Sequence, residues 1–571
     1  MHKVSIIPRG IGALASVMGL ASARSLARCL ALASLALLLF AGGAVAQERD
    51  AREVIRALIA RASLPQLRHR DFGAYRSALD AFYQAGGYAP QWVGPNAPWR
   101  EALIELTAAP THGLDPADYD VDWLKGEFEA IARGDRASER LPRADVALTV
   151  SVFRLLSDLH GGRVTPARAG FGFKTNHTPL DLAALVRVGL AKGNLHDAVA
   201  ATEPWFPLYK RLEEALARYR GFAEDSLPAI PRLPKRVRKV DPGGTYDGVG
   251  AIAERLRRVG DLPAEAPMPA RNRYDGALVD AVRAFQERHG LKADGVLGRD
   301  TLAALAVPFS ARVRQLELSL ERLRWLPELP PGPVIAVNIP SFRLWAFANA
   351  RRDAAAQLTM PVIVGGAVSA KKTPVFIGDM RYLEFSPYWN VPPNIQKNEI
   401  VPKLKKDPGY WNREELEAVA VGGKGGAITE LDAATLDGLA RGALRVRQRP
   451  GAKNALGAVK FVLPNTMDIY LHGTPAPQLF GQTRRDFSHG CIRVADPTAL
   501  AAFVLADQPD WTAERIAEAM DAEKTSTVRL ARPIPVIIFY TTAIVDANER
   551  VLFQSDIYGY DEKLEKALRQ R

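Results

Sequence analysis

Two short segments near the end of the sequence combine residue types that can do covalent chemistry. In YLHGTP, His472 precedes Gly473. Nineteen residues after His472 comes Cys491, within SHGCIRV, which also contains Ser488, His489, Gly490 and Arg493. A cysteine nucleophile with a histidine base in reach is a recurring arrangement for acyl transfer. The two segments therefore predict a thiol-dependent active site.

The elements around these segments are readable from the pattern of residues. YLHGTP ends a predicted strand and places His472 at its tip. ADPTALAAFVLAD begins a predicted helix, with Asp496 as its N-cap and Pro497 in the first turn. Cys491 is then expected just before a helix, near backbone N–H groups and a partly positive helix end. Such a setting, with a histidine in reach, predicts a lowered pKa for the Cys491 thiol.

Two other interpretations of the cluster remain open from the residues alone. His472, His489 and Cys491 would supply three zinc ligands, but no fourth ligand or catalytic carboxylate stands at a recognisable spacing. A purely structural cluster of buried polar residues is the second alternative. Two His-Gly dipeptides around a lone thiol favour nucleophilic catalysis over both, and that chemistry requires no metal or cofactor.

The N-terminus predicts export. Arg24 and Arg28 precede an apolar run that ends in Ala44-Val45-Ala46, the pattern of a signal peptide comprising residues 1–46. Its removal takes away Cys29, which leaves Cys491 as the one remaining cysteine, and lowers the formal charge from +12 to +8. No later run is long enough for a membrane span. The remaining charge favours an anionic partner such as a wall polymer and is too diffuse to indicate nucleic-acid binding.

The chain divides by composition into several parts. Residues 51–224 show helical periodicity and predict an α-helical scaffold without recognisable catalytic motifs. Residues 225–243 form a proline-rich basic linker. Residues 244–307 predict a three-helix domain, with helix ends near Gly260 and Gly290 and Asp300 as the cap of the third helix. Residues 308–332 are a helical connector.

From residue 333 to 558 the periodicity changes to short apolar runs, which predict a β-rich domain resembling a mixed sandwich or barrel. GAVKFVLPNTMDIYLHGTP predicts a hairpin at Pro464 to Thr466, and IPVIIFYTTAIVDANERVLF a second near Asp546 to Asn548. A mostly helical cap is expected as an insertion at about residues 396–444. Tyr388 and Trp389 either line the cleft or belong to the core.

Several of these segments resemble one known family. HGTP followed by SHGCIRV resembles the signature of the L,D-transpeptidase (YkuD) catalytic domain at every fixed position. NIPSFRLWAF and KTPVFIGDMRYLEFSPYWNVPPNI are similar to its strands, and AVRAFQERHGLKADGVLGRDTLAAL resembles a small three-helix peptidoglycan-binding domain. The scaffold segments YQAGGYAPQWV and HGLDPADYD resemble those of the large periplasmic members.

The resemblance implies roles for individual residues. Cys491 would attack the carbonyl between diaminopimelate and the terminal D-Ala of a wall tetrapeptide. His472 would be its base or ion-pair partner, oriented by the Gly473 carbonyl, and the backbone at Gly490 and Cys491 would form an oxyanion hole. Ser488 and His489 would shape the loop. Arg493 would bind a substrate carboxylate or carbonyl, or hold the loop through a salt bridge.

The implied activity is formation of 3→3 cross-links in the periplasm, with peptidoglycan stems as donor and acceptor. The sequence leaves the acceptor open. Water would make the chain a hydrolase, and a lipoprotein lysine would make it an attachment enzyme. A wall-binding protein with an inactive enzyme domain is the alternative from another class.

Overall fold

The computed structural model describes residues 50–571 except 95, 136–138, 174, 176, 271, 352–354, 369–370 and 423–425. The expected signal peptide lies outside the described residues. Within them, no helix has the length and apolar character needed to cross a membrane. The chain forms two compact units. The first comprises Met1–Thr107, Pro116–Leu155 and Asp181–Ala198, and the second comprises Ala108–Asp115, Leu156–Leu180 and Val199–Arg571.

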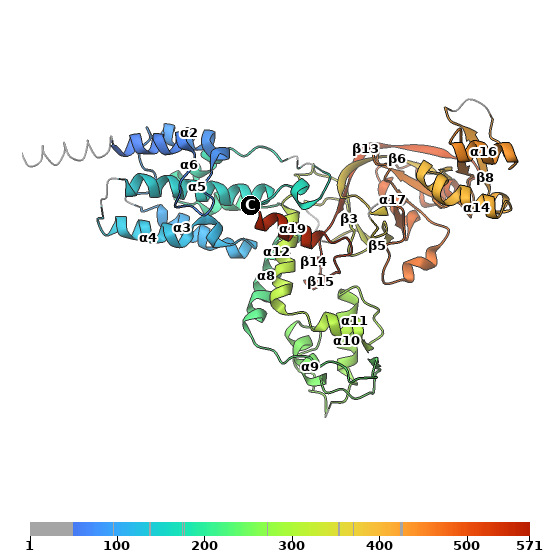
Figure 1. The fold of residues 1–571 in the computed structure, drawn as a ribbon, viewed down its shortest axis with the longest axis horizontal. Helices are drawn as coiled ribbons and strands as arrows, with labels where there is room; N and C mark the ends of the chain where they lie inside the picture. Colours follow the sequence, from blue (N-terminus) through green and yellow to red (C-terminus); the bar gives the residue numbers. More distant parts are fainter. Residues whose placement is uncertain are drawn as a thin grey trace, which may run out of the picture. The chain divides into compact units, whose positions relative to one another are not determined.

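The first unit is helical, as expected for the scaffold. It contains α2 (Arg76–Ala85), α3 (Trp99–Thr107), α4 (Val121–Ala132), α6 (Leu182–Lys192) and most of α5 (Arg140–Gly161) (Figure 1). The fully buried carboxylate of Asp145 accepts hydrogen bonds from the backbone N–H groups of Gln91 and Trp92 and from the Tyr83 hydroxyl, at 2.7 to 3.0 Å. Burial raises the pKa of Asp145 to about 6. These bonds fix the aromatic segment YQAGGYAPQWV against α5.

Two long helices support the second unit. α8 (Pro207–Glu224) packs along α12 (Phe309–Leu323), and the two run side by side in Figure 1. The contact buries apolar side chains from both helices, including Leu212, Leu216, Leu316, Leu320 and Leu323. Glu321 is completely buried beside Arg163, at 3.0 Å, and Arg324, at 3.1 Å. A buried carboxylate of this kind requires both cations, because desolvation alone would neutralise it.

The predicted three-helix domain contains α9 (Val249–Arg258), α10 (Ala277–Arg288) and α11 (Arg299–Leu305), with a small sheet of β1 (Lys239–Val240) and β2 (Leu297–Gly298). Gly260 and Gly290 follow the first two helices with φ of 81° and 63°, which confirms the predicted helix ends. The prediction for the third helix is wrong in detail. Gly298 is the N-cap of α11, and Asp300 lies in its first turn.

A closed barrel forms the β-rich domain, in the order β10-β11-β12-β5-β4-β3-β13-β6. The β11–β12 and β13–β3 pairs are parallel, and the other neighbours are antiparallel. Both predicted hairpins are present, as β10–β11 and as β14 (Ala543–Val545) with β15 (Val551–Phe553). The barrel strands are β3 (Val334–Asn338), β4 (Arg343–Phe347), β5 (Leu358–Ile363), β6 (Phe376–Phe385), β10 (Val459–Val462), β11 (Leu471–His472), β12 (Ile492–Val494) and β13 (Ser526–Phe539).

Helices flank the barrel: α17 (Pro497–Val504), α18 (Ala513–Asp521) and α19 (Tyr560–Arg569). The expected α-helical scaffold, three-helix domain and β-rich domain are thus all observed.

The cap inserted between β6 and β10 contains the expected helices and also a sheet that the sequence pattern did not reveal. Its helical elements are α13 (Pro393–Ile395), η6 (Gln396–Ile400), α14 (Val401–Lys406), α15 (Tyr410–Arg413) and α16 (Ala433–Arg441). The sheet has the order β7-β9-β8, from β7 (Trp389–Asn390), β8 (Leu416–Ala420) and β9 (Leu444–Gln448). Leu404, Trp411 and Val446 are buried in a core of the cap's own, and Trp389 packs against this core.

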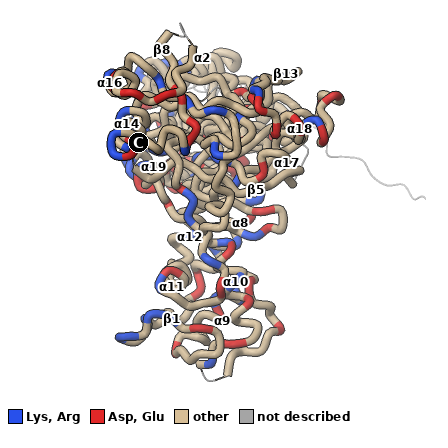
Figure 2. Tube along the Cα trace, turned by 90° about the vertical axis from the view of Figure 1, so that its right-hand side faces the viewer, with Lys and Arg blue, Asp and Glu red and all other residues tan. Residues whose placement is uncertain are grey.

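Charges are mixed over most of the chain. In Figure 2, Lys and Arg are interleaved with Asp and Glu along most elements, with a basic run at α14. That run consists of the exposed Lys403, Lys405 and Lys406. The cap therefore carries exposed positive charge along α14.

Candidate active site

His472 and Cys491 lie on neighbouring strands. β11 and β12 run parallel, with Leu471 opposite Ile492 and His472 opposite Arg493. Leu471 and Ile492 are fully buried in the barrel core. Because side chains alternate along a strand, His472, Arg493 and the preceding Cys491 project from the other face. The structure therefore places the histidine and the cysteine that the sequence singled out on the same face of two neighbouring strands.

His472 occupies the middle of a row of charged residues. Glu384 of β6, Lys460 of β10, His472 and Arg493 are successive partners across four strands. Lys460 Nζ lies 3.3 Å from Glu384 Oε2. Burial, with a further contribution from the Arg493 and Lys460 cations, lowers the pKa of His472 to about 3, although backbone hydrogen bonds with Gly473 and Leu456 act in the opposite direction. His472 is therefore a neutral imidazole at physiological pH.

One ring nitrogen of His472 has no partner. Nδ1 is buried and makes no hydrogen bond with any described residue. Buried polar atoms normally find a partner, and an exception at a candidate catalytic residue indicates a group that acts on a substrate or on a neighbouring proton. A neutral imidazole with an unoccupied nitrogen has the protonation state that a general base requires.

The predicted lowering of the Cys491 pKa is wrong for this structure. Burial raises the pKa of the thiol, while the Tyr470 backbone and hydroxyl and the Lys460 cation act to lower it. β12 lies between Cys491 and α17 along the chain, so Cys491 does not directly precede the helix as expected. Asp496 is indeed the N-cap, accepting a hydrogen bond from the Ala499 N–H at 2.8 Å, but a helix dipole acts only near its first turn. The thiol donates to the Asp468 carbonyl, with Sγ 3.4 Å from the oxygen.

Tyr470 is a site residue that the sequence analysis missed. It lies two residues before His472, on the same face of the strand, and the two ring centroids are 5.7 Å apart. Its hydroxyl hydrogen-bonds the Cys491 sulfur, and Lys460 Nζ lies 4.6 Å from the centre of its ring. The alternation of strand residues, applied backward from His472, was the signal that would have found it.

Ser488 and Gly490 help to set the conformation of the nucleophile loop (residues 488–491). Ser488 Oγ donates to the Cys491 carbonyl at 2.6 Å and accepts from the Gly490 N–H at 3.1 Å. Gly490 has φ of 124°, a conformation that residues with a Cβ rarely adopt. Thr373 Oγ1 donates to the Gly490 carbonyl at 2.7 Å, so a residue far away in sequence holds this loop.

His489 connects the loop to the cap. Its Nε2 lies 2.6 Å from Glu399 Oε1 of η6 and 2.7 Å from Lys371 Nζ. One imidazole nitrogen cannot donate to Glu399 and accept from Lys371 at once, so the tautomer selects between the two bonds. These contacts favour a role for His489 in positioning the loop and the cap over a role in proton transfer at Cys491.

Arg493 is partly buried, and its Nε has no hydrogen-bond partner among the described residues. Desolvation lowers the pKa of this guanidinium, which is the signature of a cation without a compensating carboxylate. Of the two roles left open by the sequence, contact with a substrate oxygen is the better supported. Tyr388, by contrast, stacks with Arg447, whose Cζ lies 4.2 Å from the ring centre.

No zinc site forms at this cluster in the described part of the chain. The one group of potential ligands that the described residues bring together is elsewhere, at His112, Glu203 and Glu213. There Lys210 Nζ already lies 3.1 Å from Glu213, and it also contacts Glu203. The residues His472, His489 and Cys491 do not converge as metal ligands.

Comparison with known proteins agrees with this architecture. Residues 332–538 match the family described as "L,D-transpeptidase catalytic domain" (YkuD), residues 77–216 match "Scaffold domain", and residues 245–305 match "Putative peptidoglycan binding domain". The chain therefore contains an L,D-transpeptidase catalytic domain of the YkuD family, together with a scaffold domain and a peptidoglycan-binding domain.

One curated relative is a protein of Haemophilus influenzae named "Putative L,D-transpeptidase". It is 32% identical over 282 residues, which cover 48% of this chain and 55% of the relative. The chain thus spans about half the length of the relative that it matches. A crystal structure of an L,D-transpeptidase (residues 123–326) from Xylanimonas cellulosilytica is 18% identical, covering 54% of this chain and 100% of that one. Its TM-score of 0.18 is too low to compare the folds in detail.

Proposed function

We propose that the chain is a cysteine-dependent L,D-transpeptidase that forms 3→3 cross-links between peptidoglycan stem peptides. The observation that carries this proposal is the neutral imidazole of His472, whose Nδ1 has no hydrogen-bond partner among the described residues. It lies on the same face of the β11–β12 pair as Cys491. The matched catalytic and peptidoglycan-binding domains support a wall substrate.

In the first half-reaction, His472 takes the proton of the Cys491 thiol as the sulfur attacks the carbonyl between diaminopimelate and the terminal D-Ala. The Tyr470 hydroxyl and the Lys460 cation stabilise the thiolate during this transfer. The C–N bond breaks, His472 returns the proton to the amine of D-Ala, and a thioester on Cys491 remains. Because burial raises the resting pKa of the thiol, little thiolate is present at neutral pH, and His472 takes the proton as the attack proceeds.

The oxyanion of the tetrahedral intermediate needs backbone donors. The Gly490 N–H is already bonded to Ser488 Oγ, so we assign the Cys491 N–H as the principal donor. Loss of one such donor typically costs about 10²–10³ in rate. Arg493 would bind a carboxylate of the donor stem, which neutralises its otherwise uncompensated charge.

In the second half-reaction, the side-chain amine of diaminopimelate on another stem attacks the thioester, releases Cys491 and forms the cross-link. The cap is placed to influence which acceptor enters, because Glu399 contacts the nucleophile loop through His489. Water or a lipoprotein lysine as acceptor would use the same acyl-enzyme. Wall chemistry also implies export to the periplasm, in agreement with the expected signal peptide.

The test uses digested wall fragments with the wild-type chain, Cys491→Ala and His472→Ala, followed by mass spectrometry. We expect a thioester adduct with release of D-Ala, then cross-linked dimers, in the wild type. Cys491→Ala should give neither, and His472→Ala should slow acylation by about 10²–10⁴. Trimmed tripeptides without dimers would show hydrolysis instead. An adduct that persists in Cys491→Ala would refute the assignment of the nucleophile.

A further inference from the structure

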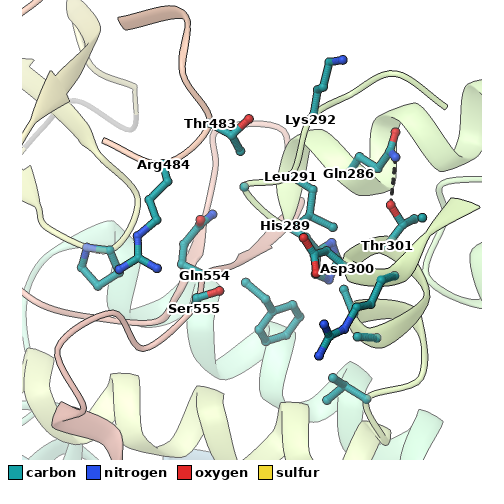
Figure 3. Close-up of a pocket in the computed structure, with 18 of the residues that line it drawn as sticks. Gln286, His289, Leu291, Lys292, Asp300, Thr301, Thr483, Arg484, Gln554 and Ser555 are labelled. Carbon is teal, nitrogen blue, oxygen red and sulfur yellow. Dashed lines mark hydrogen bonds between the residues drawn. The ribbon is translucent and has the colours of Figure 1, made fainter. Parts of the chain in front are cut away.

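A cavity of the second unit lies away from Cys491, between the three-helix domain and the barrel domain. Its volume is about 740 Å³. Ligand sites typically enclose roughly 300–1,000 Å³. In Figure 3, Lys292 and Thr301 of the three-helix domain face Thr483, Arg484 and Ser555 of the barrel domain across this space.

The junction that encloses the cavity is well packed. The buried Arg288 of α10 donates to the Val551 carbonyl of β15 at 3.0 Å and is held by Asp261. Gln315 of α12 donates to the Gln554 carbonyl at 2.9 Å, and the His289 ring lies 5.8 Å from the Phe553 ring. These buried contacts give the cavity walls on both sides a fixed relationship.

The lining has more cations than carboxylates, although Lys292 lies 3.5 Å from Asp294 and Arg484 is paired with Asp486. Four cationic residues line the cavity, against two acidic ones, Asp294 and Asp300; the cations are Lys292, Arg299, Arg312 and Arg484. Arg312 is notable because its hydrogen bonds go to neutral acceptors, the Ala304 carbonyl at 3.2 Å and the Gln315 side-chain oxygen at 2.9 Å. Burial and neighbouring arginines lower the pKa of Arg312 to about 10. An anionic ligand would relieve this destabilisation.

The other lining groups suit a saccharide. Thr483, Ser555 and Gln554 offer hydrogen-bonding groups to the hydroxyls and amides of a sugar.

The cavity is linked to the nucleophile by the chain itself. Thr483 and Arg484 precede Cys491 by eight and seven residues. A fully extended segment of that length spans at most about 25 Å. Arg484 is bonded to Asp486 at 2.7 and 2.9 Å, and the Arg485 carbonyl accepts from the Val364 N–H at the end of β5. Arg484 of the cavity lining therefore lies within about 25 Å of Cys491. A polymer bound in the cavity can extend over that distance and present a neighbouring stem at Cys491.

We propose that this cavity is a second substrate subsite, shared by the three-helix domain and the barrel domain, that binds a carboxylate-bearing strand of N-acylated amino sugars. The inference rests on the proposed function for the identity of the polymer and extends it to a particular site. It makes recognition of the polymer a property of both domains together.

The experiment measures binding of purified disaccharide-peptide oligomers to the full chain carrying Cys491→Ala, so that no chemistry interferes. Arg299→Ala removes an exposed cation from one wall, and Ser555→Trp fills the cavity from the other. Arg283→Ala is the matched control, because Arg283 is an exposed arginine of the same domain that pairs with Asp280 outside the cavity. We expect Kd to rise about ten- to a hundred-fold for Arg299→Ala, corresponding to the loss of about one charged hydrogen bond. Ser555→Trp should weaken binding further.

A kinetic arm separates this inference from the proposed function. With Cys491 restored, KM for polymeric substrate should rise in Arg299→Ala and Ser555→Trp, while turnover of a soluble stem peptide without sugar stays at the wild-type rate and reports correct folding. Unchanged Kd in both variants, or a change from one wall only, would overturn the shared subsite. Equal affinity for an uncharged chito-oligosaccharide would overturn the carboxylate requirement. If the wild type binds as expected but forms no acyl-enzyme, the proposed function fails and the subsite stands.

Discussion

Tyr470→Phe tests how the site generates a reactive thiolate. The substitution removes the hydroxyl that hydrogen-bonds the Cys491 sulfur and leaves the ring, with its contacts to Lys460 and His472, in place. A hydrogen bond to a charged group contributes about 1.5–3 kcal/mol, and one pKa unit corresponds to about 1.36 kcal/mol. The pKa of Cys491 should therefore rise further by about 1–2 units.

The assay is the rate of iodoacetamide alkylation of Cys491 across the neutral to alkaline range, followed by mass spectrometry of the peptide that contains Cys491. At neutral pH the thiolate fraction, and with it the rate, should fall about 10- to 100-fold. At high pH, where the thiol is fully ionised, the variant should react slightly faster than the wild type, because a more basic thiolate is a better nucleophile. The crossing of the two profiles distinguishes a pKa change from simple loss of access.

Tyr388→Phe is the matched control, because Tyr388 stacks with Arg447 of the cap sheet. Its profile should overlay that of the wild type. If Tyr470→Phe also overlays the wild type, the hydroxyl does not stabilise the thiolate, and the role assigned to Tyr470 is refuted.

Three further results are expected. Arg493→Gln removes a cation that lowers the pKa of His472, so the acid limb of the kcat/KM profile should move to higher pH. The lost substrate contact should also lower kcat/KM about 10- to 100-fold. An acid limb that does not move would contradict the coupling between Arg493 and His472. Glu399→Gln weakens the partly exposed contact between Glu399 and His489, which is worth at most about 1 kcal/mol. Acylation should therefore slow less than about five-fold, while hydrogen exchange of the η6 amides accelerates. Unchanged exchange would rule out a cap contact at His489. Asp145 has a raised pKa in the folded state, so between its unfolded and folded pKa values the native scaffold binds more protons than the unfolded chain. The stability of the scaffold should therefore fall as pH rises toward about 6, by up to about 1.4 kcal/mol per pH unit. Hydrogen exchange of the amides bonded to Asp145 measures this slope, which Asp145→Asn should abolish.

The predicted part of the site and the part that was missed differ in how they are encoded. His472 and Cys491 were recognisable because they stand in short motifs with fixed neighbours. Glu399, Thr373 and Lys371 were not, because each reaches the nucleophile loop from a segment about ninety or more residues away. The helix after Asp496 was predicted correctly, yet the short strand β12 before it was not, and this changed the expected electrostatics of the thiol.

The sequence by itself indicated the types of domain, the positions of most of their helices and hairpins, and a candidate nucleophile and base, because periodicity, caps and motifs are local properties of the chain. Only the tertiary structure decided the protonation state of His472 and created the cavity between the three-helix domain and the barrel domain. Burial keeps His472 neutral, together with the Lys460 and Arg493 cations that strand register places on either side of it. The packing of α10 against β15 creates a cavity that no single segment contains. Both depend on burial and on distances between residues remote in sequence, which the order of residues does not specify until the chain has folded.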